Sequence, residues 1–302
     1  MGYVEHFELE REPFSNAPDA RFYFDSDQHS QALLRLLYSI DSNKGLAVLV
    51  GGIGMGKTTL ARRLLDNLPE SKYESSLLVM VHSGITAEWI LTRIAMQLGV
   101  EEPASDRLTV LKQLFDRLKE IDDSGRHAVV LIDEAQMLQS RELMEEFRGL
   151  LNLELPGKKL LNIVFFGLSE LEECLNLDEP LAQRVAVKYH LRSLTSAATE
   201  LYIKHRLQVA RAKRMLFRPE AVSAIYRYTG GVPRLINTVC DNALFEAFLL
   251  KMSSVDQKII HSVAGDLGLL KNAVMTSTAE SSSDNAELDE IENMLDQLER
   301  KA

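Results

Sequence analysis

The residues from Gly51 to Thr58 read Gly-Gly-Ile-Gly-Met-Gly-Lys-Thr and match the phosphate-binding pattern G-x4-G-K-[ST] in full. Glycines let backbone N–H groups curve around phosphate oxygens, and the helix expected next offers its positive end. Lys57 is expected to contact the β- and γ-phosphates, and Thr58 to ligate Mg²⁺. The sequence therefore predicts a site for ATP with Mg²⁺. The other predicted contacts with ATP come from Gly52, Gly54, Met55, Gly56 and Thr59.

A second pattern, farther along the chain, is an apolar run that ends in two acids, Ala128-Val129-Val130-Leu131-Ile132-Asp133-Glu134. Asp133 is expected to hold the Mg²⁺ shell, and Glu134 to orient and deprotonate an attacking water. In isolation such a pair would be an ordinary strand end at the surface. Following a phosphate loop, it predicts hydrolysis of ATP and not binding alone.

Two arginines and one serine are further candidates for contacts with phosphate. Arg184 lies between the last two predicted strands, where it could reach the γ-phosphate of a neighbouring subunit; the alternative is a solvated surface arginine. Arg234 follows a Gly-Gly-Val-Pro turn and could point onto the nucleotide, or could simply begin a helix. Ser169 is the polar candidate for a sensor, but it also begins a Ser-x-x-Glu capping box with Glu172.

The elements that must position these residues alternate between strand and helix up to about residue 194. Continuous Val/Ile/Leu strands between helices predict an α/β fold, a parallel P-loop sheet with helices on both faces. The predicted strands are 45–50, 77–81, 128–132, 160–166 and 185–191. The predicted helices are 29–40, 58–68, 87–98, 108–121 and 141–153.

After residue 194 the pattern is helical throughout, over 196–211, 219–228, 234–250 and 256–266. We therefore expect a small all-helical lid domain behind the α/β domain. The expected divisions are 1–30 as an N-terminal segment, 31–194 as the α/β domain, 195–270 as the lid, 271–287 as a Ser-rich linker and 288–302 as a terminal helix.

The predicted terminal helix is amphipathic, with apolar residues on one face and acids on the other. This pattern is typical of a helix that docks onto a protein partner, a second copy of the chain or the body of its own chain; the alternative is an acidic tail that aids solubility. Its apolar positions are Leu288, Ile291, Leu295 and Leu298.

Bulk composition narrows the class of protein. The 302-residue chain holds no apolar run near the length of about eighteen residues that a membrane span requires. Cys174 and Cys240 lie in apolar runs and are expected to be buried thiols, which together with an acidic N-terminus predicts a cytoplasmic protein. A net charge of −10 disfavours a nucleic-acid partner. The candidate basic cluster for such a partner is Arg211, Lys213, Arg214 and Arg218, which could equally be a solvated helix end.

With these residues in view, the chain resembles, over about residues 3–270, the ExeA/GspA family of general-secretion-pathway AAA+ ATPases, which is related to the TniB/TnsC transposition ATPases. The lid carries Glu200-Leu201-Tyr202-Ile203-Lys204-His205-Arg206-Leu207, followed by the Gly-Gly-x-Pro-Arg turn and Asp266-Leu267-Gly268. The N-terminal signature is Phe7, Glu12-Pro13-Phe14, Pro18-Asp19, Phe22-Tyr23, His29 and Ala32-Leu33.

The resemblance implies that the N-terminal segment and the lid surround the adenine. It carries this role over to Pro13, Phe14, Tyr202 and Ile203, for which core packing is the alternative. The chain departs from the family's pattern after the fourth strand, where Gly167-Leu168-Ser169 replaces the usual Gly-Gln-Pro. The secretion branch often carries a transmembrane helix and a peptidoglycan-binding domain after the ATPase, and we expect neither from the residues of this chain.

We therefore expect an ATP hydrolase that works as a homo-oligomer and serves a cell-envelope machine for secretion, pilus assembly or polysaccharide export. It would lie in the cytoplasm, or peripherally at the inner membrane through a partner. The alternatives are a DNA-binding regulator of the transposition type and a slow, nucleotide-gated scaffold.

Overall fold

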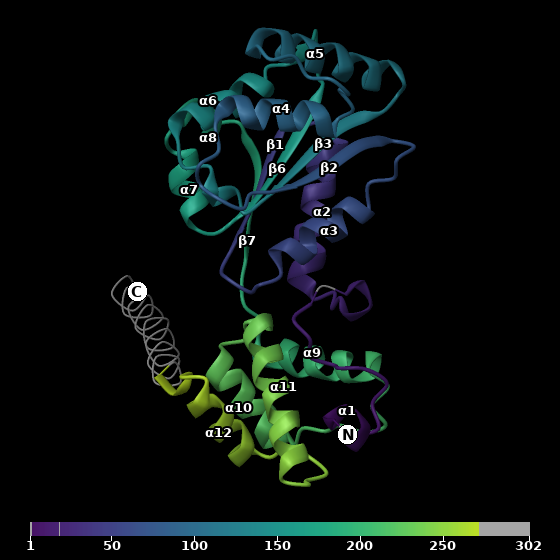
Figure 1. Ribbon diagram of the computed structural model, residues 1–302, viewed down its shortest axis with the longest axis vertical. Coiled ribbons are helices and arrows are strands. Elements are labelled where there is room, and N and C mark those ends of the chain that lie inside the picture. The colour runs from purple at the N-terminus through teal and green to yellow at the C-terminus, as the bar shows by residue number, and fades with distance from the viewer. Residues whose placement is uncertain (1, 18, 272–302) are drawn as a thin grey trace, which may run out of the picture. The chain divides into compact units, whose positions relative to one another are not determined.

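The computed structural model describes residues 2–17 and 19–271, and the chain forms two compact units (Figure 1). Asp25–Arg192 form an α/β unit, and the described residues of Met1–Phe24 and Ser193–Ala302 form a helical unit. The predicted terminal helix, 288–302, and all of the predicted linker except residue 271 lie outside the described residues.

The α/β unit contains the predicted parallel sheet, with its five strands in the order β2-β3-β6-β1-β7. The order places β1 and β3, which carry the two motifs, on either side of β6. The phosphate loop and the acidic pair Asp133-Glu134 both lie at the carboxyl ends of their strands, the edge of the sheet where ligands of such folds bind. The strands are β1 (Leu46–Gly51), β2 (Tyr73–Val79), β3 (His127–Asp133), β6 (Leu161–Gly167) and β7 (Val185–Leu191).

Helices cover both faces of this sheet, as the continuous apolar strands predict. Successive side chains of a strand point to opposite faces, so Leu49 packs with α2 (Asp27–Asp41) and α3 (Lys57–Asp66), while Val48 packs on the other side. The helices of that other side are α4 (Ala87–Gln97), α5 (Arg107–Asp123), α6 (Arg141–Leu150), α7 (Glu170–Leu175) and α8 (Glu179–Ala182).

The edge strand β2 differs most from its predicted bounds of 77–81. It begins at Tyr73, ends at Val79 and leaves Val81 80% exposed. An edge strand is partly open to solvent, so it accommodates the half-buried polar residues Glu74 and Ser75, which a fully buried strand would not. Several elements were too short to show a period in the sequence: α7, α8, a two-stranded hairpin of β4 (Glu154–Leu155) and β5 (Lys158–Lys159), and the 3-10 turn η2 (Ala135–Met137).

Among the residues that the structure describes, the helical unit packs α9 to α12 with the N-terminal segment around an apolar core. Phe14, which is fully buried, and Tyr3 and Phe7 of that segment belong to the same core as Ile203. The elements are α9 (Ser196–Val209), α10 (Pro219–Thr229), α11 (Pro233–Leu249) and α12 (Gln257–Asp266), with α1 (Tyr3–His6) and the 3-10 turn η1 (Ala20–Phe22).

The turn that leads into α11 requires a glycine. Gly231 has a φ of +73°, and a Cβ there would lie 1.9 Å from the carbonyl oxygen of Leu194. The backbone N–H of Leu194 in turn donates to the Gly231 carbonyl at 2.9 Å. This close approach ties the beginning of the helical segment to the turn before Arg234.

Candidate nucleotide site

The phosphate loop is the turn between β1 and α3. Gly54 and Gly56 have φ values of +77° and +93°, a region of backbone conformation that glycine adopts readily. Gly56 precedes the first residue of α3 and offers no capping side chain. The N–H groups of the first helical turn therefore have no side-chain cap, which is the arrangement that binds anions at a helix start.

Lys57 is folded against this loop. Its side-chain Nζ donates to the carbonyls of Gly51 at 2.9 Å and Gly52 at 3.0 Å, and the residue is only 6% exposed. Burial lowers the pKa of Lys57, an effect that the nearby carboxylates of Glu134, Asp133 and Glu170 oppose. The loop thus holds a partly desolvated cation among acidic side chains.

Thr58 and Asp133 meet at the centre of the site although they come from different elements. The Thr58 hydroxyl donates to Asp133 Oδ2 at 2.6 Å, and Asp133 is fully buried. Burial raises the pKa of Asp133, while the bonds from Thr58 and from the Glu134 N–H lower it. Mg²⁺ usually takes one or two protein oxygens and completes its octahedron with phosphate oxygens and water. A hydroxyl and a carboxylate at this distance fit that donor set.

Glu134 has a left-handed backbone, with φ +55° and ψ +37°, which costs a residue with a Cβ about 1–2 kcal/mol. Its N–H donates to Asp133 Oδ1 at 2.9 Å, and its Oε2 accepts from Gln136 Nε2 at 2.5 Å. The first bond holds the Glu134 backbone just beyond the end of β3, and the second holds its half-buried carboxylate. Strain of this kind is typical of residues whose position matters for function.

Gln136 is a site residue that the sequence analysis missed. It lies in the turn η2, is 4% exposed, and its amide oxygen accepts from the backbone N–H of Leu168 at 3.1 Å. Its position two residues after the acidic pair, inside an otherwise apolar turn, was the available signal.

The capping box predicted for Ser169 and Glu172 does not form. Ser169 has helical backbone angles where a cap residue is extended, and its hydroxyl donates to Glu170 at 3.0 Å. Glu172 instead pairs with Lys188 and contacts His190 on β7. Glu170 is the acid of this segment whose charge acts on Lys57.

Arg184 belongs to the α/β unit and binds its own chain. Its Nη1 donates to Asn152 Oδ1 at 2.5 Å and to the Arg148 carbonyl at 3.3 Å, both just beyond or within α6. The side chain is half-buried, so part of the guanidinium faces solvent.

The remaining predicted contacts lie in the helical unit. Phe14, Tyr202 and Ile203 are buried in its core, and Tyr202 donates to Asn237 Oδ1 at 2.8 Å. Arg234 is exposed at the first turn of α11.

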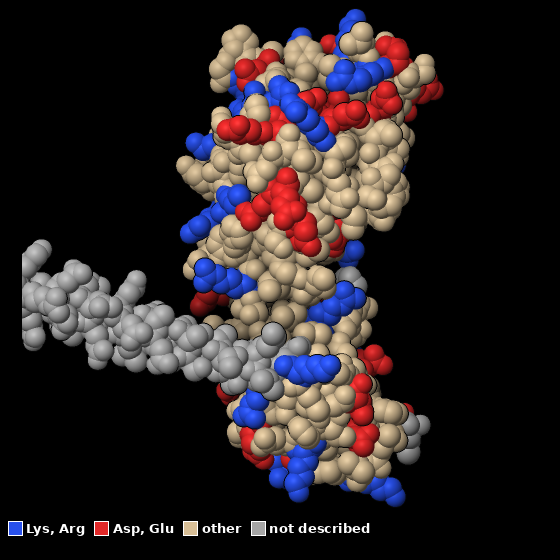
Figure 2. Space-filling view, turned by 90° about the vertical axis from the view of Figure 1, so that its left-hand side faces the viewer, with Lys and Arg blue, Asp and Glu red and all other residues tan. Residues whose placement is uncertain are grey.

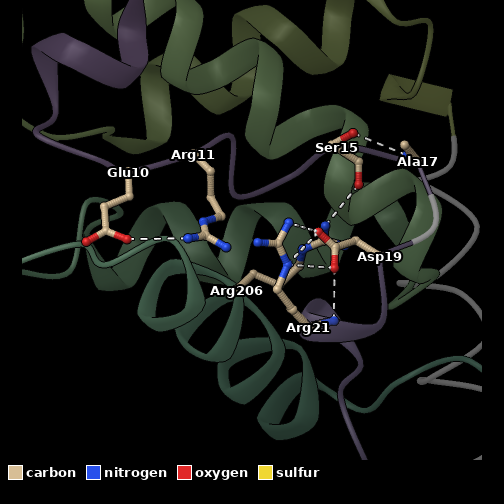
Figure 3. A network of polar contacts seen from close by, with 7 residues as sticks. All are labelled: Glu10, Arg11, Ser15, Ala17, Asp19, Arg21 and Arg206. Atoms are coloured by element: carbon tan, nitrogen blue, oxygen red, sulfur yellow. Dashed lines mark hydrogen bonds and ion pairs between the residues drawn. The ribbon is translucent and has the colours of Figure 1, made fainter.

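A buried arginine holds the N-terminal segment in that unit. Arg206 donates to the carbonyls of Pro13 at 2.6 Å and Ser15 at 2.9 Å and to the Tyr202 hydroxyl at 2.8 Å. Its guanidinium lies 4.7 Å from the centre of the Phe22 ring. Figure 3 shows Arg206 beside the exposed ion pair of Arg21 and Asp19. Arg206 thus ties Pro13 and Ser15 of the N-terminal segment to α9, in addition to the apolar packing of that segment.

The basic cluster proposed for nucleic acid is largely occupied by contacts within the chain. Lys213 pairs with Glu8, Arg214 donates to the Ser253 carbonyl, and Arg218 donates to Ser254. On the face seen in Figure 2, Lys and Arg lie among Asp and Glu.

Within the described part of the chain no helix is both long enough and apolar enough to cross a membrane.

Comparison with known proteins identifies a family model and a curated relative to which this chain is similar. Residues 40–175 match the family model described as an AAA domain. Over 275 residues the chain is 36% identical to the general secretion pathway protein A of Aeromonas hydrophila, a match that covers 88% of this chain and 47% of that protein. The chain thus spans about half the length of this curated relative.

Solved structures with the same fold include two proteins named ORC. The ORC2 protein of Aeropyrum pernix, in ADPNP–ADP complexes, is 17% identical to this chain, with a TM-score of 0.62. The match covers 85% of this chain and 71% of the ORC2 chain. The structure of Drosophila ORC bound to DNA is 17% identical to this chain, with a TM-score of 0.65. The match covers 87% of this chain and 66% of the ORC chain. At this identity the likeness shows the fold, a P-loop sheet followed by a helical region.

Proposed function

Because the chain belongs to the ExeA/GspA family of AAA ATPases over the 88% that aligns with its secretion relative, we propose that it binds Mg-ATP and hydrolyses it. The observation that carries the proposal is the bond of 2.6 Å between the Thr58 hydroxyl and the buried Asp133, with Glu134 next in the chain. It supports one metal-bound nucleotide between the two motifs.

In this proposal each residue of the site has a role that follows from its chemistry. Mg²⁺, when bound, would neutralise phosphate charge, and Thr58 and Asp133 would hold it. Lys57 would leave the loop carbonyls and donate to the β- and γ-phosphates. Glu134 would accept a proton from the water that attacks the γ-phosphate, giving ADP and phosphate.

The helical unit and a second subunit would complete the site. Arg184 would contact the γ-phosphate of a neighbouring copy in a homo-oligomer, and Arg234 would contact the nucleotide of its own chain. Since Phe14, Tyr202 and Ile203 are buried, they would shape the adenine side through packing.

The proposed setting is a cell-envelope system for secretion, pilus assembly or polysaccharide export. The name of the relative from Aeromonas hydrophila supports the first of these, secretion. The protein would act in the cytoplasm or at the inner membrane through a partner that binds residues 288–302. DNA binding is the less favoured function, because the basic side chains named above are engaged with their own chain.

Phosphate release from ATP, measured with Mg²⁺ and with excess chelator, tests the proposal. We expect Mg-dependent turnover that Lys57→Ala abolishes through loss of ATP binding, because Lys57 is the cation of the loop. Arg62→Ala, an exposed change in the same helix, is the matched control and should bind ATP like the parent. A folded Lys57→Ala protein with parental ATP affinity would refute the site.

A further inference from the structure

We propose that Gln136 is a positioning residue for Glu134 and links its carboxylate to the end of β6. This inference rests on the proposed function, because it assigns a role in the same hydrolysis. It concerns a side chain that makes its contacts entirely within the α/β unit.

Chemistry fixes the orientation of the Gln136 amide. The backbone N–H of Leu168 is a donor, so the atom that faces it at 3.1 Å must be the amide oxygen. The amide nitrogen then faces Glu134 Oε2 at 2.5 Å and donates to it. In the flipped orientation, the amide nitrogen would face the Leu168 N–H, which is also a donor, and the amide oxygen would face the Glu134 carboxylate, which is also an acceptor. Only the observed orientation therefore forms both hydrogen bonds.

The residues around Gln136 restrict the conformation of its side chain. Gln136 is 4% exposed, and its own carbonyl accepts from the Cys174 thiol of α7 at 3.7 Å. A Cβ on Gly167 would lie 3.0 Å from the Gln136 amide oxygen, so the glycine allows the close approach. On the neighbouring strand, Val79 stands opposite Asp133 and its apolar side chain cannot donate to the carboxylates.

The Gln136 side chain connects two parts of the proposed site. Its β3 end holds Glu134, which would activate water. Its β6 end leads within two residues to Glu170, whose charge acts on Lys57 of the phosphate loop. A shift of β6 that follows the state of the γ-phosphate would therefore move the Glu134 carboxylate through Gln136.

Three variants test this role against a purely structural one. Gln136→Leu keeps the approximate volume and removes both bonds. Gln136→Glu keeps the size and the acceptor for Leu168 N–H but sets a carboxylate oxygen against Glu134. Gln139→Leu, an exposed glutamine just after the same turn, is the matched control.

We expect kcat of Gln136→Leu to fall about tenfold or more, within the range of about 10–100-fold for supporting contacts at catalytic sites. ATP affinity should stay within about twofold, because Gln136 does not belong to the phosphate loop. Gln136→Glu should lose at least as much kcat as Gln136→Leu, although it fits the site better. A purely structural role gives the opposite order, with Gln136→Glu the milder change.

The same measurements on Glu134→Gln separate this inference from the proposed function. If Glu134→Gln stops hydrolysis but folded Gln136→Leu and Gln136→Glu keep the parental kcat, the role of Gln136 is overturned and the ATPase stands. If Glu134→Gln turns over ATP like the parent, the catalytic role of Glu134 and the role of Gln136 are both overturned. Absence of Mg-dependent turnover in the parent would overturn the proposed function itself. Should Gln136→Leu not fold, as judged by circular dichroism, the rate of Gln136→Glu decides.

Discussion

Asp133 and Glu134 are neighbours in sequence, but the fold gives them different environments. Asp133 ends β3, is fully buried and bonds to Thr58, whereas Glu134 turns into a left-handed conformation and remains half-exposed. Contiguous motifs revealed both residues in the sequence. Gln136 could not be predicted, because its second partner, Leu168, lies just beyond the end of another strand, β6, and offers only a backbone N–H.

His29 gives a prediction for pH dependence at this scale. Its Nδ1 lies 2.6 Å from Ser26 Oγ and its Nε2 lies 3.2 Å from the Met55 carbonyl, so Nε2 carries the hydrogen and Ser26 donates to Nδ1. Burial lowers the pKa of His29. The unfolded chain then binds a proton more readily, so the contribution of His29 to stability is complete above about pH 6.5 and is lost as the pH falls toward the lowered pKa.

The parent should therefore lose stability relative to His29→Gln as the pH falls from about 7.5 to 5.5, over the range where an ordinary histidine titrates. Urea unfolding of both proteins at each pH measures this difference, and other titrating groups cancel in the comparison. Parallel pH profiles for the two proteins would contradict the role of the neutral imidazole.

At the scale of elements, the central strands were predictable because burial on both faces demands continuous apolar runs. The bounds of the edge strand β2 were predicted wrongly, because half-buried positions of an edge strand tolerate the polar side chains of Glu74 and Ser75. The helices α7 and α8 were missed because four to six residues show no period. The packing of the N-terminal segment on α9 and α11 depends on distant contacts, such as the 2.5 Å bond from the Tyr3 hydroxyl to Asp241.

Arg206 should be the main support of that packing. Arg206→Met leaves two carbonyls and a hydroxyl without their donor, and we expect a loss of about 2–4 kcal/mol in the free energy of unfolding. Arg206→Lys should lose a comparable amount, because one ammonium cannot reproduce the fork of donors. Lys204→Met, an exposed change on the same helix, is the control for urea unfolding. Equal stability of Arg206→Met and Lys204→Met would contradict this role.

At the scale of the whole molecule, the sequence predicted an α/β unit followed by helices, and the structure contains both. The AAA domain model matches residues 40–175, which lie within the α/β unit. The proposal of a homo-oligomer depends on Arg184. Within the chain this side chain binds the end of α6, and a neighbouring copy would compete for its guanidinium.

If Arg184 completes the site of a neighbour, specific ATPase activity should rise with protein concentration. Mixing Arg184→Ala with Glu134→Gln should restore some turnover, because one interface of a mixed assembly then holds both intact residues. Arg141→Ala, an exposed arginine on α6, serves as the control in place of Arg184→Ala. Activity independent of concentration in a monomeric protein would contradict the shared site.

The central claim is that the chain hydrolyses ATP with Glu134 as the base, and Glu134→Gln tests it most directly. This change keeps the shape of the side chain and removes its capacity to take a proton. Titration with ATP and Mg²⁺, followed by measurement of the phosphate released, separates binding from turnover in one preparation. We predict a folded Glu134→Gln protein that binds ATP with parental affinity and releases phosphate at least about a hundredfold more slowly, at the lower end of what general-base catalysis supplies. Parental phosphate release by Glu134→Gln would contradict the account.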